Sequence, residues 1–149
     1  SIIEDGILES LLHTRETAYE MNAQSTGSAH GLTHVPRCLM SNIYVKARDW
    51  NHEELIEETR RGIYIRGVVR AQSTPVEGLF LIQPESATVI RKGQLQETIR
   101  GSRVTGVALE ALKGVDGIGD RLAMRATVEK EFNISDGGPP LRISSLRLQ

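Results

Sequence analysis

The sequence predicts an α+β domain in which most strands pair antiparallel and two or three short helices lie between them. Short apolar stretches alternate with polar residues and are separated by Gly-containing turn signals, a pattern typical of antiparallel hairpins. Other segments place apolar residues at helical spacing and begin or end at capping residues. Because the sequence contains neither an internal repeat nor a linker, residues 1–149 are predicted to form a single domain.

Turn signals predict two hairpins. Asp5-Gly6 separates two short apolar stretches, and Asp-Gly tolerates the positive φ angles of a tight type I′ turn. Gly93 has the same role in the turn 91–94, between predicted strands at 86–90 and 95–100. Further predicted strands cover 38–47, 63–71, 78–83, a stretch after Asp120 and 141–148, with turns at 116–120 and 135–140.

Capping residues predict where the helices lie. The helix 52–61 is predicted to begin at Asn51, where Glu54 completes a capping box, and to end at Gly62 in a left-handed cap. A short helix is predicted at 14–22 with Thr14 as its N-cap. An amphipathic helix is predicted from Val104 to a stop at Gly114. The polar segment 23–37 reads as a long loop, of the kind that often carries a binding element.

Composition narrows the classes of function. The chain has 18 Lys and Arg residues against 19 Asp and Glu residues, a net charge of −1. Nucleic acid and anionic membranes are therefore not expected partners, since their affinity comes mostly from basic side chains that neutralise phosphates. No apolar run approaches the roughly 20 residues that a membrane span needs. The single Cys38 cannot form an internal disulfide, which favours a cytoplasmic protein.

Residues that could carry chemistry do not form a complete catalytic set. His30 and His34 are four positions apart, which suits a pair of metal ligands on a helix, but they lie in a loop segment where solvated histidines are the alternative. Cys38 is interpreted as a small buried hydrophobic residue, although Arg37 beside it could lower its pKa. Phosphate-binding loops and nucleophile elbows are absent from the sequence. We therefore assign no catalytic residue and no metal ligand to this chain.

Several short motifs together resemble the C-terminal portion of the TldD/PmbA family. No single motif is specific, but their order and spacing cover nearly the whole chain and continue to a closing Gly-Gly-Pro that is similar to the TldD branch. The motifs are Ile2–Leu8, Ser25–Ala29, Pro36-Arg37, Met40–Tyr44, Glu53–Ile56, Arg61–Tyr64, Gly93, Arg100-Gly101, Val115–Leu122 and Ser135–Pro139.

The resemblance implies a peptide-processing system. TldD-like proteins are metallopeptidases that act in peptide maturation and proteolysis, pair with a PmbA-like (TldE) subunit, and carry the older label of modulators of DNA gyrase. The family's zinc site uses a HExxxH helix upstream of the segment matched here, together with a Cys in a Gly-x-Cys-Gly-Lys stretch. The metal-binding half is therefore expected to lie upstream of this chain, and zinc to bind there in a catalytic member.

Two departures from the family pattern affect which of the family's properties are expected of this chain. The chain lacks the HExxxH motif, and the stretch 122–128, where the metal-binding Cys would fall, contains neither Cys nor Gly. This chain alone is therefore expected to be inactive. Two hypotheses follow: a C-terminal domain of a metallopeptidase that helps form the substrate cleft and subunit interface, or a non-catalytic PmbA-like scaffold or peptide-binding subunit.

The resemblance also directs the search for binding residues. An extended peptide can add to an exposed strand through main-chain hydrogen bonds, and the loop before the strand at 40–45 is a natural place for such contacts. We predict Arg37, Asn42 and Tyr44 as peptide-binding residues. The expected partners are a peptide substrate and either a PmbA/TldE-like subunit or a second copy of the protein.

Overall fold

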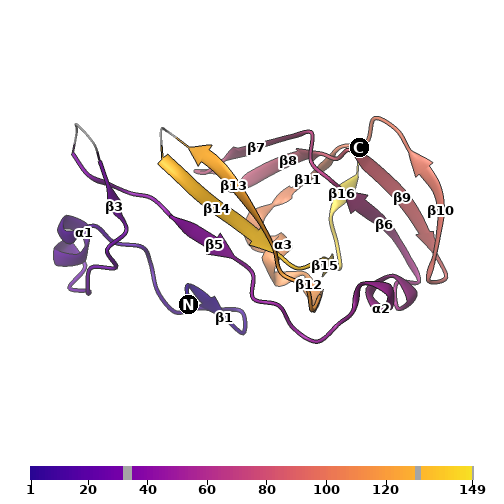
Figure 1. Cartoon of the computed structure of the whole chain (residues 1–149), viewed down its shortest axis with the longest axis horizontal. Coiled ribbons are helices and arrows are strands. Elements are labelled where there is room, and N and C mark those ends of the chain that lie inside the picture. The colour runs from indigo at the N-terminus through magenta and orange to yellow at the C-terminus, as the bar shows by residue number, and fades with distance from the viewer. Residues whose placement is uncertain (32–34, 130–131, 149) are drawn as a thin grey trace. The chain divides into compact units, whose positions relative to one another are not determined.

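The computed structural model describes residues 1–31, 35–129 and 132–148 (Figure 1). Short strands predominate and most of them pair antiparallel, with three short helices among the described residues, which confirms the predicted α+β class. None of these helices is long and apolar enough to span a membrane. The chain divides into two compact units, each made of two separate stretches, and its organisation as a single domain stays a prediction.

The first unit comprises residues 1–45 and 123–137. It contains two two-stranded antiparallel hairpins and one three-stranded sheet in the order β13-β14-β5. Its elements are β1 (Ile3–Glu4), β2 (Ile7–Leu8), α1 (Arg15–Glu20), β3 (Ala29–His30), β4 (Arg37–Cys38), β5 (Asn42–Tyr44), β13 (Ala123–Glu129) and β14 (Phe132–Gly138).

The second unit comprises residues 46–122 and 138–149. Its sheets have the strand orders β10-β9-β6, β16-β11-β8-β7 and β12-β15. Its elements are α2 (His52–Glu57), β6 (Arg61–Arg66), β7 (Arg70–Thr74), β8 (Leu79–Gln83), β9 (Ser86–Arg91), β10 (Gln94–Ile99), β11 (Val104–Val107), α3 (Ala108–Lys113), β12 (Val115–Ile118), β15 (Leu141–Ile143) and β16 (Arg147–Leu148).

Both predicted hairpins are confirmed. Asp5 and Gly6 have φ angles of 48° and 80° between β1 and β2, and Lys92 and Gly93 have φ angles of 50° and 74° between β9 and β10. Two successive positive φ angles are the signature of a type I′ turn, whose twist matches that of the flanking strands. The residues within each turn therefore determine these two hairpins.

The N-terminal caps of two of the predicted helices are also confirmed. The Asn51 side chain accepts a hydrogen bond from the Glu54 N–H at 2.8 Å, and the Glu54 carboxylate accepts one from the Asn51 N–H at 3.0 Å. Thr14 and Thr17 form the equivalent reciprocal pair at α1. The predicted end at Gly62 is wrong: α2 stops at Glu57, and Gly62 lies in β6 because it pairs with Ile90 of β9.

Three other predictions near the C-terminal half are wrong. Residues 104–107 form β11 rather than the start of a helix, because the β-branched residues Val104, Thr105 and Val107 suit pairing with β8 better than a helical turn. Residues 135–138 continue β14, and residues 115–118 form β12, where turns were predicted. Gly137 and Gly117 mark close approaches: an added Cβ would lie 2.7 Å from Met124 Sδ and from Leu55 Cδ2, respectively.

Several predicted segments are divided differently. The loop 23–37 contains β3, which pairs with β4, and the strand predicted at 38–47 is reduced to β5. The strand predicted at 63–71 is interrupted, since β6 ends at Arg66 and β7 begins at Arg70. The last strand, predicted at 141–148, is two short strands in two different sheets. In each case the missing information was which strand each segment pairs with.

The apolar core is small. Among the described residues no large side chain is completely buried. Short strand pairings and a few polar contacts therefore hold the elements of each unit together. The buried apolar residues are Ala18, Leu55, Ala87, Ile90, Val104, Ala111 and Ile134.

One of these polar contacts anchors β15 in the second unit. Arg142 donates a hydrogen bond from Nε to Asp116 Oδ1 at 2.7 Å, and its guanidinium lies 5.1 Å from the centre of the Trp50 ring. Trp50 in turn forms a parallel bridge with Gly119, whose N–H donates to the Pro140 carbonyl at 2.8 Å. Three stretches that are distant in the sequence are thus held together.

Replacing Gly93 by alanine should destabilise the fold more than replacing Gly101. Both glycines have positive φ, 74° and 70°, where a side chain costs about 1 kcal/mol. At Gly93 an added Cβ would also collide with the backbone of Glu57 at the end of α2, whereas nothing lies within 4 Å at Gly101. Urea denaturation of the two variants measures this difference. Equal losses of unfolding free energy would show that the approach of α2 is not constrained.

Candidate functional site

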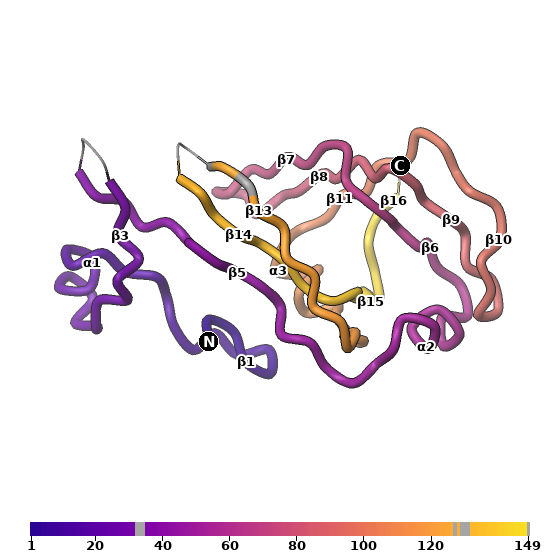
Figure 2. The backbone as a smooth tube through the Cα atoms, in the orientation of Figure 1, coloured from indigo at the N-terminus to yellow at the C-terminus, as the bar shows by residue number. Residues whose placement is uncertain are grey.

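The strand β5 forms an edge of the sheet β13-β14-β5 (Figure 2). It pairs parallel with β14, with Asn42, Ile43 and Tyr44 opposite Ser135, Asp136 and Gly137. Among the described residues no strand pairs with its other side. An unpaired edge presents a row of free N–H and C=O groups that another extended chain can use.

The hydrogen bonds to β14 show which main-chain groups are free. The Ser135 N–H donates to the Ser41 carbonyl at 2.8 Å, and the Val45 N–H donates to the Gly137 carbonyl at 3.1 Å. In a parallel ladder, alternate residues of a strand direct their N–H and C=O groups to opposite neighbours. The main-chain groups of Asn42 and Tyr44 therefore point toward the open edge.

The side chains of Asn42 and Tyr44 share one face of the sheet, because residues two apart in a strand point the same way. Both are exposed, and 51% of the Tyr44 surface is accessible. The residue opposite Tyr44 is Gly137, which has no side chain. The Met124 side chain fills the space above Gly137, where an added Cβ would lie 2.7 Å from its Sδ, and about half of the Tyr44 surface remains available for contact with a ligand.

Arg37 lies apart from this pair in the strand order. It is exposed in β4, opposite His30 in a separate two-stranded sheet. The structure therefore brings Asn42 and Tyr44 to one strand and places Arg37 in another. The roles of all three as peptide-binding residues stay predictions.

The histidines and the cysteine have mainly structural surroundings. The His30 ring lies 5.5 Å from the Phe132 ring and the His52 ring 5.3 Å from the Tyr64 ring, while His34 falls outside the described residues. Cys38 is only partly buried in β4, not fully buried as predicted. Within residues 1–31, 35–129 and 132–148, no three His, Cys, Asp or Glu side chains are placed to hold a metal ion. These residues do not fit a zinc site.

An ion pair on β13 and β14 was missed by the sequence reasoning. Arg125 donates two hydrogen bonds to Asp136, from Nε at 3.2 Å and from Nη2 at 2.7 Å. The hydrogen bond and the negative charge of Asp136 raise the pKa of the Arg125 guanidinium above its ordinary value. Asp136 had been predicted to lie in a turn, so nothing in the sequence linked the two residues.

Comparison with known proteins identifies the family to which the chain belongs. Residues 1–149 match the PmbA/TldA metallopeptidase C-terminal domain. The chain is 35% identical over 147 residues to a metalloprotease of Methanothermobacter thermautotrophicus, covering 95% of this chain and 32% of that protein. It is 38% identical over 138 residues to a metalloprotease of Methanocaldococcus jannaschii, covering 91% and 28%. The chain thus spans about a third of the length of these curated relatives.

Other relatives extend the comparison. A zinc metalloprotease TldD homolog of Saccharolobus solfataricus is 24% identical over 153 residues, covering 99% of this chain and 34% of that protein. Two solved structures share the fold. A proposed modulator of a DNA gyrase from Thermotoga maritima superposes with a TM-score of 0.77 at 21% identity, covering 99% of this chain and 32% of that one. TldE from Thermococcus kodakarensis superposes at 0.75 and 17% identity, covering 99% and 33%.

The ion pair between Arg125 and Asp136 should contribute measurably but modestly to stability. Both side chains are partly exposed, at 65% and 36%, and pairs of this kind contribute about 0.2 to 1 kcal/mol. We expect a double-mutant cycle of Arg125→Ala and Asp136→Ala, followed by urea denaturation, to give a coupling energy in this range. Strictly additive losses would show that the pair does not connect β13 to β14 energetically.

Proposed function

Because the chain belongs to the PmbA/TldA metallopeptidase C-terminal domain family, we propose that it is the C-terminal domain of a TldD/PmbA-like metalloprotease and holds an extended peptide substrate along the open edge of β5. The unpaired main-chain groups of Asn42 and Tyr44 are the observation that carries this proposal. They offer donors and acceptors at the spacing of a β-strand, which an extended peptide matches.

Recognition through the main chain makes few demands on the sequence of the peptide. Hydrogen bonds to N–H and C=O groups are available to any extended segment except at proline, while side-chain pockets supply selectivity. Tyr44 and Asn42 would contact alternate residues of the peptide on one face of the sheet. Arg37 would add a positive charge for an acidic group of the peptide, and the same domain would help form the substrate cleft.

The metal is proposed to bind elsewhere in a longer polypeptide. The described residues do not provide a zinc ligand set, whereas the Saccharolobus relative is named a zinc metalloprotease. We therefore place the zinc, and with it the chemistry of cleavage, in the part of the polypeptide that this chain does not contain. Residues 1–149 alone are expected to be inactive.

The proposed setting is the maturation or proteolysis of peptides in the cytoplasm. A PmbA/TldE-like subunit or a second copy would be the partner, an idea supported by the shared fold with TldE. The near-neutral composition offers no electrostatic attraction to nucleic acid, so a DNA-directed role is not proposed.

A non-catalytic role is the second candidate. The chain contains no Cys after Cys38, and its fold matches TldE as well as the Thermotoga protein. Both observations would suit a PmbA-like scaffold or a peptide-binding subunit that lacks the chemistry. The open reading frame distinguishes the two: a HExxxH motif in the same polypeptide supports the peptidase, and its absence supports the scaffold.

Tyr44→Pro should weaken peptide binding more than Tyr44→Ala in the full-length polypeptide. Proline removes the outward N–H without breaking a hydrogen bond to β14, and edge strands tolerate it. Alanine removes the phenol ring but keeps the N–H. One lost hydrogen bond corresponds to an affinity about two- to tenfold lower, measured by fluorescence anisotropy with a labelled peptide.

One control accompanies this measurement. Circular dichroism should show that both variants keep the native secondary structure. Equal affinities for the proline and alanine variants would contradict main-chain recognition at β5.

Arg37→Ala tests the third predicted residue: if both peptide binding and cleavage remain unchanged, Arg37 is not part of the site.

Chelation should separate the peptidase from the scaffold. For the full-length polypeptide purified with any co-expressed partner, we expect about one zinc ion per chain by elemental analysis, and peptide cleavage that a chelator abolishes and added zinc restores. A protein with neither metal nor cleavage would support the scaffold. Cleavage that is unaffected by the chelator would contradict both candidates.

A further inference from the structure

The strand β8 is apolar on both of its faces. It reads Leu-Phe-Leu-Ile-Gln over residues 79–83 and lies inside the sheet β16-β11-β8-β7. Successive side chains of a strand point to opposite faces, so Leu79 and Leu81 lie on one face and Phe80 and Ile82 on the other. Strands of this composition are typical of sheets that are covered on both sides.

The cover of β8 is uneven: Phe80, Leu81 and Ile82 are half-buried, whereas Leu79 is exposed. Val104, opposite Ile82, is 3% exposed. On the other face Leu79 and its partner Val107 are 46% and 38% exposed. The neighbouring helix α3 contributes Ala111 to the same surface.

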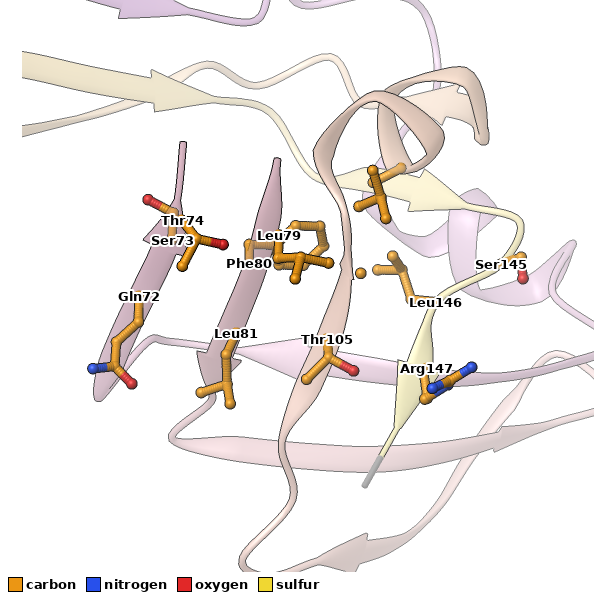
Figure 3. Close-up of a pocket in the computed structure, with 13 residues that line it drawn as sticks. Gln72, Ser73, Thr74, Leu79, Phe80, Leu81, Thr105, Ser145, Leu146 and Arg147 are labelled. Carbon is orange, nitrogen blue, oxygen red and sulfur yellow. The ribbon is translucent and has the colours of Figure 1, made fainter. Parts of the chain in front are cut away.

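A groove of about 920 Å³ runs along this part of the sheet (Figure 3). Its lining combines leucine and valine side chains with hydroxyl and amide groups such as those of Gln72 and Thr105. Arg147 is the one charged residue among the residues that line it. The groove therefore suits an apolar protein surface with a few hydrogen-bonding groups, and not a strongly charged ligand. We refer to the surface of Leu79, Leu81 and Val107 as the β8 face.

The exposed area of the whole chain exceeds that of compact domains of the same size. The chain exposes 11496 Å², whereas two separate compact domains with the masses of its two units would together expose about 9,100 Å². The excess is therefore about 2,400 Å², roughly three times the area that one partner buries in an interface of standard size. A single dimer contact of ordinary size would leave most of this excess exposed.

We propose that the β8 face is covered by a part of the same polypeptide that lies outside these 149 residues. The curated relatives support this occupant over a second copy, because this chain matches only 32% and 28% of two of them and a further two thirds of such a protein would be available as cover. The covering segment would bury Leu79 and Val107 in the manner of an interdomain core. The proposal does not depend on peptide binding at β5.

Two matched substitutions in the full-length polypeptide test the cover. Leu79→Arg places a charge on the β8 face, whereas Val76→Arg changes a fully exposed residue of the same hairpin. Because Leu79→Arg would bury a charge without a partner, it should lower the melting temperature by about 5 °C or more. The melting temperature of the Val76→Arg control should stay within about 1 °C of that of the unmodified protein. Equal effects of the two variants would overturn the proposal.

A photo-crosslinking amino acid in place of Leu81 identifies the occupant even if Leu79→Arg fails to fold. A crosslink within one polypeptide to a peptide from outside residues 1–149, found by mass spectrometry, is the expected result. Crosslinks to a second copy, to another protein or only to peptides within residues 1–149 would overturn the proposal. An intact mass showing that the native polypeptide has only these 149 residues would also overturn it.

Discussion

The parallel pairing of β5 with β14 is the contact on which the first unit and its candidate site depend. It joins residues 42–44 to residues 135–137 and so makes one sheet from two separate stretches of the chain. The same pairing decides which groups remain free, since hydrogen bonds to Ser41 and Val45 leave those of Asn42 and Tyr44 directed outward. Without it, β5 would be three exposed residues with no defined orientation.

A small core has consequences for both proposals. The buried apolar residues are few, and three of them are alanines. Many of the leucines and valines that a compact domain would bury are instead exposed around β8 and α3. Since apolar burial is the main favourable contribution to folding, a domain of this kind gains much of its stability from whatever covers it. An open strand edge and an open sheet face are both what a domain within a larger assembly presents.

The two surfaces are suited to different partners. The edge of β5 offers main-chain hydrogen bonds, which tolerate many sequences and fit a transient peptide. The β8 face offers side chains of fixed shape with little charge, which fit a permanent interface. Loss of one surface should therefore affect binding, while loss of the other should affect stability.

Turns and helix starts could be read from the residues because each depends on neighbours a few positions away. Asp5-Gly6, Lys92-Gly93 and the capping boxes at Thr14 and Asn51 are examples, and the family resemblance was likewise carried by short ordered motifs. The free edge at Asn42 and Tyr44, the ion pair of Arg125 with Asp136 and the strand character of residues 135–138 were decided only by tertiary structure. Each depends on which strands pair, and for Asn42, Tyr44 and residues 135–138 the paired segments are distant in the chain. A glycine that permits such a close approach reads in the sequence like a glycine in a turn.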